Sequence, residues 1–137
     1  MTVEHIYKVG TLLFDNLQDA ETFDEYSKSF NKKQLKELYK GYKSKINYKS
    51  YLNPEFDFKQ MEQIYFGLMS KVNVAIYNKP EFSWEQMREM RHGLKDKLNI
   101  KFYSNPKFYW TKMERRRKVL KKVDKIKKVI LFKSRKK

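Results

Sequence analysis

The residues best suited to chemistry in this 137-residue chain are cations clustered near its C-terminal end. Nine of the fourteen residues from 115 to 128 are Lys or Arg, and eight of them are our candidates for contacting phosphate: Arg115, Arg116, Arg117, Lys118, Lys121, Lys122, Lys125 and Lys128. Cations at this density neutralise nucleic-acid phosphates and release counterions, without reading bases. Tyr39, Tyr42 and Tyr48 lie among further lysines and are candidates for stacking on bases.

The net charge of +16 is distributed unevenly along the sequence. Residues 1–26 carry six acids and one lysine, for a net charge of −5, whereas residues 27–107 carry 17 basic and 8 acidic residues, net +9. Residues 108–137 carry 14 basic and 2 acidic residues, net +12. A basic end of this kind attracts polyanions or acidic partners.

A basic amphipathic helix has several possible uses. It can bind nucleic acid, lie on a membrane surface, fit an acidic protein groove, or only keep the protein soluble. Val119, Val123, Ile126 and Ile130 form one apolar stripe along it, which we expect to pack over the preceding helix. Because that stripe contains no Trp and is needed for packing, we favour nucleic acid over a membrane.

The elements that position these cations are set by a 26-residue period. Tyr, Pro, Phe and Met recur at this spacing, in the columns Tyr51, Tyr77, Tyr103; Pro54, Pro80, Pro106; Phe56, Phe82, Phe108; and Met61, Met87, Met113. A fixed period of this size is typical of stacked helical units. We predict an all-α solenoid with an N-terminal cap at 1–28, three repeats at 29–107, and a fourth repeat extended into a long basic helix at 108–137. Within the cap, a short acidic helix is expected from Asp19 to Tyr26.

Each repeat begins with the same helix-start signal. Asp57 and Gln60 are placed as a capping box, and the pattern recurs at Ser83 with Gln86 and at Asn31 with Gln34. The apolar spacing then predicts helices of about 14 residues. Asn47, Asn73 and Asn99 follow the last turns, where we expect them to take the left-handed conformation that ends a helix. The fourth repeat has neither signal, so its start is weaker and its helix continues to about Phe132.

The connectors between helices allow two interpretations. A single helical turn or a short strand both fit about twelve residues that end before a proline, giving either an all-helical solenoid or a strand-lined horseshoe. We prefer the short helix. Gly41, Gly67 and Gly93 lie inside the predicted helices at a cost of about 1 kcal/mol each relative to Ala, which indicates that a neighbouring element approaches closely there.

The columns resemble a short Tyr-x-x-Pro-x-Phe…Gln-Met…Gly-Leu repeat of poorly characterised bacterial, phage and mobile-element proteins. The resemblance covers roughly residues 30 to 113. It implies a helical repeat module without catalytic machinery, and the lysine-rich C-terminal helix departs from it.

Other chemistries find little support. His5 and His92 are the only histidines and are far apart, cysteine is absent, and no phosphate loop or Ser/His/Asp set is present. Glu62, Glu85 and Glu89 are spaced as surface ion-pair partners. We therefore expect no enzyme, cofactor or metal, and a cytoplasmic location without a membrane span. The predicted function is nucleic-acid or nucleoprotein binding, and the alternative is a phage or mobile-element inhibitor, of the anti-CRISPR kind, that docks on a host protein.

Overall fold

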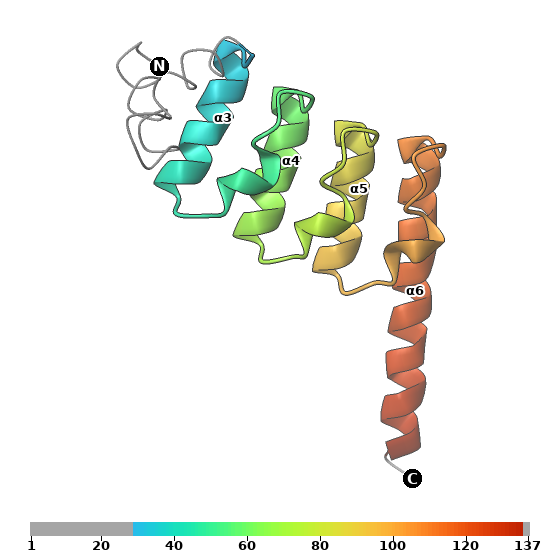
Figure 1. Cartoon of the computed structure of the whole chain (residues 1–137). Helices are drawn as coiled ribbons and strands as arrows, with labels where there is room; N and C mark the ends of the chain where they lie inside the picture. Colours follow the sequence, from blue (N-terminus) through green and yellow to red (C-terminus); the bar gives the residue numbers. More distant parts are fainter. Residues whose placement is uncertain (1–28, 136–137) are drawn as a thin grey trace.

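A computed structural model of the chain describes residues 29–135, in which all regular structure is helical (Figure 1). The α-helices are α3 (Lys32–Lys43), α4 (Phe58–Met69), α5 (Trp84–Lys95) and α6 (Trp110–Arg135). The connectors carry the 3₁₀ helices η1 (Tyr48–Tyr51), η2 (Val74–Ile76) and η3 (Ile100–Phe102). The short-helix prediction for the connectors is thus confirmed, and the strand-lined alternative is wrong for these residues. The N-terminal cap, its acidic helix and His5 lie outside the described residues.

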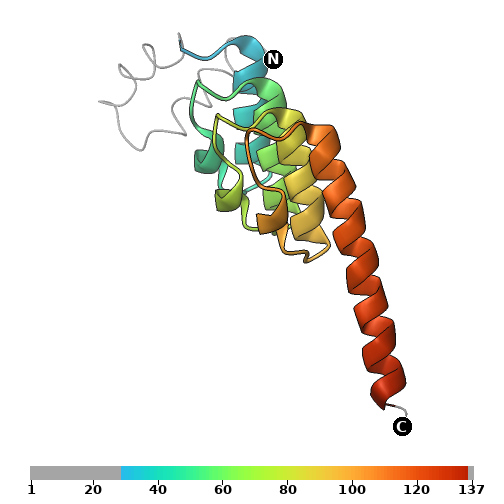
Figure 2. The same cartoon turned by 90° about the vertical axis from the view of Figure 1, so that its right-hand side faces the viewer.

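The α-helices lie side by side in sequence order, and the 3₁₀ helices follow along one side of the row (Figures 1 and 2). We call each α-helix with the 3₁₀ helix after it a unit. Helix α4 packs between α3 and α5, and α5 packs between α4 and α6. The α-helices before α6 have 12 residues, slightly fewer than predicted, whereas α6 has 26 and extends beyond the row (Figure 1).

A buried glutamine fixes the start of each of the helices α3, α4 and α5. In α4, Gln60 completes the predicted capping box. Its side-chain oxygen accepts from the backbone N–H of Asp57 at 2.9 Å, and its backbone N–H donates to the Asp57 carboxylate at 2.8 Å. The side-chain nitrogen of Gln60 also donates to the carbonyls of Pro80 and Phe82, at 3.1 and 2.6 Å. The residues 26 positions earlier and later, Gln34 and Gln86, make the same contacts. One side chain therefore caps its own helix and also binds the segment that leads into the next helix.

The helix ends differ from the sequence prediction. The left-handed residues are Lys45, Lys71 and Lys97, with φ of 57°, 59° and 58°. Around Lys71, the amide of Val72 donates to the Gly67 carbonyl at 3.0 Å and that of Lys71 to Leu68 at 3.1 Å, the two bonds of a Schellman motif. The prediction for the asparagines is wrong, since all three keep negative φ. Asn73 and Asn99 instead cap the next 3₁₀ helix with their side chains.

The predicted close approach at the glycines is confirmed, and a tyrosine is the neighbour. Tyr77 is fully buried and donates its hydroxyl to the carbonyl of Gln63 in α4 at 2.7 Å. A Cβ at Gly67 would overlap that hydroxyl and come within 2.7 Å of the Val74 Cγ1. Tyr51 sits on Gly41 and Tyr103 on Gly93 in the same way. Burial raises the pKa of each phenol well above its usual range, so each remains a donor.

The core is a continuous layer between the helices and their connectors. The predicted methionine column is fully buried, as are Leu38, Ile64 and Met90, which recur at 26-residue spacing in α3, α4 and α5. Phe56 and Phe82 are also buried, whereas Phe108, near the last helix, is only partly so. This burial means that the three methionines, Phe56 and Phe82 serve packing and are not available for stacking on bases.

We expect Gly67→Leu to lower the free energy of unfolding by about 3 kcal/mol, because the new side chain must displace Tyr77 and Val74 from a packed site. Thermal or urea unfolding followed by circular dichroism measures this. Glu62→Ala in the same helix is the control and should change stability by no more than about 0.5 kcal/mol. Equal small effects in both variants would contradict close packing at the glycines.

Candidate nucleic-acid interface on helix α6

Helix α6 begins at the same point of the 26-residue period as α5, but without a capping glutamine and without the residues that would let a further unit follow. Lys112 replaces the glutamine found at 34, 60 and 86, and Arg116 replaces the buried apolar residue found at 38, 64 and 90. Val119 stands in place of the periodic glycine. A tyrosine cannot sit against a valine as it does against a glycine, so no connector returns here and the helix continues to Arg135.

Five of the predicted phosphate-contacting cations already have protein partners. The Arg116 guanidinium donates to the Phe102 carbonyl at 2.7 Å and lies 4.8 Å from the centroid of the Phe108 ring. The other four form ion pairs: Arg117 with Glu89 (2.8 Å), Lys118 with Glu114 (2.8 Å), Lys121 with Asp96 (3.2 Å) and Lys128 with Asp124 (3.0 Å). All of the lysines in these pairs are well exposed, so their pairs contribute little and can exchange partners.

The remaining three candidates, Arg115, Lys122 and Lys125, are exposed and make no ion pair with any residue in 29–135. Spacings of seven and three residues place them on one side of α6, together with Lys118. We call Arg115, Lys118, Lys122 and Lys125 the outer ridge. Only Lys118 of these four has a carboxylate partner within the described chain, so the outer ridge carries a largely uncompensated positive charge.

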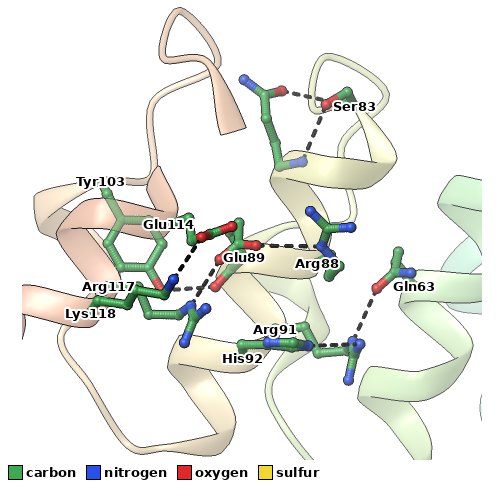
Figure 3. A network of polar contacts seen from close by, with 11 residues as sticks. Gln63, Ser83, Arg88, Glu89, Arg91, His92, Tyr103, Glu114, Arg117 and Lys118 are labelled. Atoms are coloured by element: carbon green, nitrogen blue, oxygen red, sulfur yellow. Dashed lines mark hydrogen bonds and ion pairs between the residues drawn. The ribbon is translucent and has the colours of Figure 1, made fainter. Parts of the chain in front are cut away.

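Arg117 has a different place from the rest of the cluster (Figure 3). It points into the contact between α5 and α6, where its side chain is 13% exposed and meets Glu89, which is 3% exposed. Arg88 approaches the other oxygen of Glu89 at 3.4 Å. Glu89 is therefore a buried ion-pair partner and not the surface partner that its spacing predicted. Because Arg117 is paired with Glu89, we do not include it in the outer ridge.

The Arg117–Glu89 pair has a counterpart one unit earlier. Arg91 donates to the side-chain oxygen of Gln63 at 3.1 Å, so residues 28 apart join neighbouring helices in both cases (Figure 3). The 26-residue columns do not reveal this contact, because its two residues belong to different columns. A search for polar pairs separated by one period plus two residues would have found it.

His92 lies beside these arginines and is partly buried. One Arg91 nitrogen is 3.3 Å from its Nε2. Burial, and then the positive charges of Arg91 and Arg117, lower the pKa of His92 below its usual value, with Glu89 opposing them. The folded protein therefore favours the neutral ring.

The candidate stacking tyrosines are less available than expected. Tyr39, Tyr42 and Tyr48 are all half-buried, and Tyr42 packs edge-on against Tyr48 with ring centroids 6.2 Å apart. Cations contact the rings of another column with 26-residue spacing, Phe58, Trp84 and Trp110. Lys59 and Arg88 both lie over the Trp84 ring, at 5.2 and 5.1 Å, and Arg88 lies 5.1 Å from the ring of Trp110. Arg88 thus links α5 and α6 through two rings.

The apolar stripe of α6 is not packed as predicted. Val119, Val123, Ile126 and Ile130 are 59%, 41%, 59% and 60% exposed, whereas Met113 is fully buried and Leu120 packs against the core. The stripe is exposed because α6 extends beyond the end of α5, and no helix among the described residues lies beside its second half (Figure 1). The stripe is correct as a sequence pattern, and its assignment to packing is wrong.

We expect Glu89→Ala to destabilise the protein by about 3 kcal/mol, because it leaves the largely buried Arg117 without any acceptor at this position. Glu89→Gln is the matched control and should cost much less, since Gln63 accepts from Arg91 in the same arrangement. Chemical denaturation of both variants measures the difference. If Ala and Gln cost the same, the negative charge of Glu89 accounts for the whole cost and a neutral acceptor cannot replace it.

Stability should also depend on pH through His92. Since its folded-state pKa is depressed, the unfolded chain binds the proton first as the pH falls below about 6.5. The stabilising contribution is present above that pH and is lost as the pH falls through the folded-state pKa. Denaturation at several pH values between about 7.5 and 5 should show a smaller decrease in stability for His92→Gln than for the parent. An identical decrease in both proteins would show that His92 does not contribute.

Comparisons with protein-family models, with curated proteins and with solved structures find no significant match to this chain. Between residues 29 and 135, no group of His, Cys, Asp or Glu could hold a metal ion, and no helix is long and apolar enough to cross a membrane. A functional hypothesis must therefore be based on the charges and contacts of α6 itself.

Proposed function

We propose that this protein binds the phosphate backbone of nucleic acid, or of a nucleic-acid-containing complex, through the outer ridge of α6, and that it is not an enzyme. The observation that carries the proposal is the set Arg115, Lys122 and Lys125, which faces solvent on a projecting helix with no carboxylate partner in the described chain. Cations in this state exchange only water and counterions when they bind phosphate, so no internal ion pair has to be broken.

The dimensions of the outer ridge suit a nucleic-acid strand. Ten residues separate Arg115 from Lys125, which corresponds to about 15 Å along a helix axis. That length spans roughly four phosphates of one strand in a duplex. The exposed pairs of Lys121 and Lys128 can open at little cost and add contacts. Because the ridge carries no set of side chains arranged to read base edges, sequence preference should be weak.

We make a second proposal, which concerns the architecture of the whole chain. We propose a helical-repeat solenoid, with residues 1–28 as its N-terminal cap and residues 108–137 as a terminal repeat that ends in the basic helix. The support is that the glutamine, tyrosine and Schellman contacts recur at 26-residue intervals through the first three units. The three units before α6, which we call the body, would then hold α6 rigidly in place.

A second candidate is favoured by one observation, the exposed apolar side chains on α6. A phosphate backbone does not bury valine and isoleucine, whereas a protein partner does. The sequence resemblance to phage and mobile-element repeats adds the hypothesis of an inhibitor, of the anti-CRISPR kind, that docks on a host protein or nucleoprotein. In this case nucleic acid would contribute only to the host target.

Neutralising Arg115, Lys122 and Lys125 together to Gln should weaken binding to a fluorescently labelled single-stranded or duplex oligomer at low salt. The parent should lose affinity as salt increases, with a log–log slope of about −3 if four phosphates are neutralised. Fluorescence anisotropy over a salt series measures both quantities, and the triple variant should show a slope closer to zero.

The matched control neutralises three exposed lysines on the body, Lys36, Lys43 and Lys49, and so removes the same net charge. It should keep most of the parent's affinity. Equal weakening in both triple variants would mean that net charge alone attracts nucleic acid, and no binding by the parent at low salt would overturn the proposal and favour the inhibitor.

A further inference from the structure

The exposed stripe of α6 has the spacing of a coiled-coil seam. Its members, Val119, Val123, Ile126 and Ile130, are separated by four, three and four residues. This alternation keeps side chains on one line of a helix that faces a second helix, with Val and Ile at the a and d positions of a heptad. We call these four residues the apolar seam. All four have at least 41% of their surface exposed against the described chain.

The apolar seam begins at a groove on the body. An open groove of about 610 Å³ lies where α6 passes η3, and it is lined by Phe102, which is 59% exposed, Lys112, Arg115, Arg116, Val119 and Leu120. In the earlier units the connector tyrosine occupies the corresponding place over the glycine. Farther along α6, Ile126, Val129 and Ile130 form a second depression of about 400 Å³ with Lys122 and Lys125. Apolar surface is thus continuous along roughly three turns of the helix.

Lysines border the apolar seam on both sides. Lys122 lies on one side of it and Lys127 on the other, at the g and e positions that face a partner helix across a coiled coil. Neither lysine forms an ion pair with a described residue. Residues 110–135 contain twelve basic side chains and two acidic ones. A complementary helix would therefore carry Glu or Asp at its own flanking positions.

The side chains of the apolar seam and its flanking lysines argue against two other occupants of the seam, a second copy of this chain and nucleic acid. Pairing of two copies of α6 would bring lysines against lysines at the flanking positions, which is destabilising. Nucleic acid satisfies the cations but leaves the valines and isoleucines exposed to water. An acidic amphipathic helix satisfies both sets of side chains at once.

We propose that the apolar seam is a docking site for an acidic amphipathic helix of a partner protein, with apolar residues at its a and d positions and Glu or Asp at its e and g positions. The partner helix would pack along Val119 to Ile130 and place its carboxylates beside Lys122 and Lys127. The groove at Phe102 would receive one end of it. This inference goes beyond nucleic-acid binding and uses the side of α6 next to the outer ridge, with Arg115, Lys122 and Lys125 at the border of both.

The test uses the full chain and three synthetic four-heptad peptides with a fluorescent label. The first has Leu or Ile at a and d with Glu at e and g, the second keeps the apolar positions with Lys at e and g, and the third keeps Glu with Ser at a and d. We expect the first peptide to bind and the other two to bind at least about tenfold more weakly, since each lacks one half of the complementarity. Anisotropy titration at about 150 mM salt, where surface charges are partly screened, measures the affinities.

A triple variant, Val123→Ser, Ile126→Ser and Ile130→Ser, changes the apolar seam without changing any charge. It should remain helical by circular dichroism, because these residues are exposed, and should bind the first peptide about tenfold more weakly or worse. Its affinity for an oligonucleotide should be unchanged, so failure of this inference and failure of the proposed function are distinguishable. Equal binding of the first and third peptides would overturn the inference.

Two further results would assign the apolar seam to other occupants. Sedimentation of the parent as a dimer, with the triple variant a monomer, would show that a second copy covers it. Binding of the parent to vesicles rich in phosphatidylserine, abolished in the triple variant, would show that it serves a membrane surface. Either result, together with weak binding of the acidic peptide, would overturn docking of a partner helix.

Discussion

The contact on which the rest of this structure depends is a tyrosine hydroxyl placed against a helix backbone. In each of the first three units, a connector tyrosine donates to a carbonyl fourteen residues earlier, and a glycine leaves the room for its ring. This contact folds the connector back along its helix and directs the chain into the next unit. The glycine costs helix stability, and burial of a whole phenol ring offsets that cost.

The same contact explains why the row ends where it does. Val119 stands in place of the glycine, and Val129 stands where the next tyrosine would be. Lys112 cannot bind the carbonyls of a following unit as the glutamines do and also close a capping box, because an ammonium group has no acceptor. Since the glycine, the tyrosine and the glutamine are all replaced, the residues that follow Val119 in α6 have no site on the helix against which a connector could fold back. A straight, projecting helix is the physical consequence, and both proposed binding surfaces lie on it.

Much of the body could be predicted from the sequence, because its contacts lie within one period. The capping boxes, the glycine contacts and the buried methionines all follow from residues whose neighbours recur at 26-residue intervals. The left-handed lysines could not be predicted in this way, since Asn and Gly are the usual residues there and the Schellman geometry depends on where the helix is interrupted. Burial of Glu89 and exposure of the apolar seam escaped prediction for a related reason. Each depends on whether a neighbouring helix covers that turn, and periodicity within one chain does not contain this information.

Solubility alone does not account for the composition of α6. If α6 only had to keep the protein soluble, polar residues would be expected on every face of the part that extends beyond the other helices, because there is no core for that part to cover. Between residues 123 and 132, however, six large apolar side chains are 41% to 60% exposed: Val123, Ile126, Val129, Ile130, Leu131 and Phe132. Within the body, by contrast, Lys112 and Arg116 replace the residues that would otherwise bind or pack against a further unit. Charged side chains therefore replace two of the residues that a further unit would need, whereas large apolar side chains are kept where the helix projects, which is the distribution expected of a surface that meets a partner.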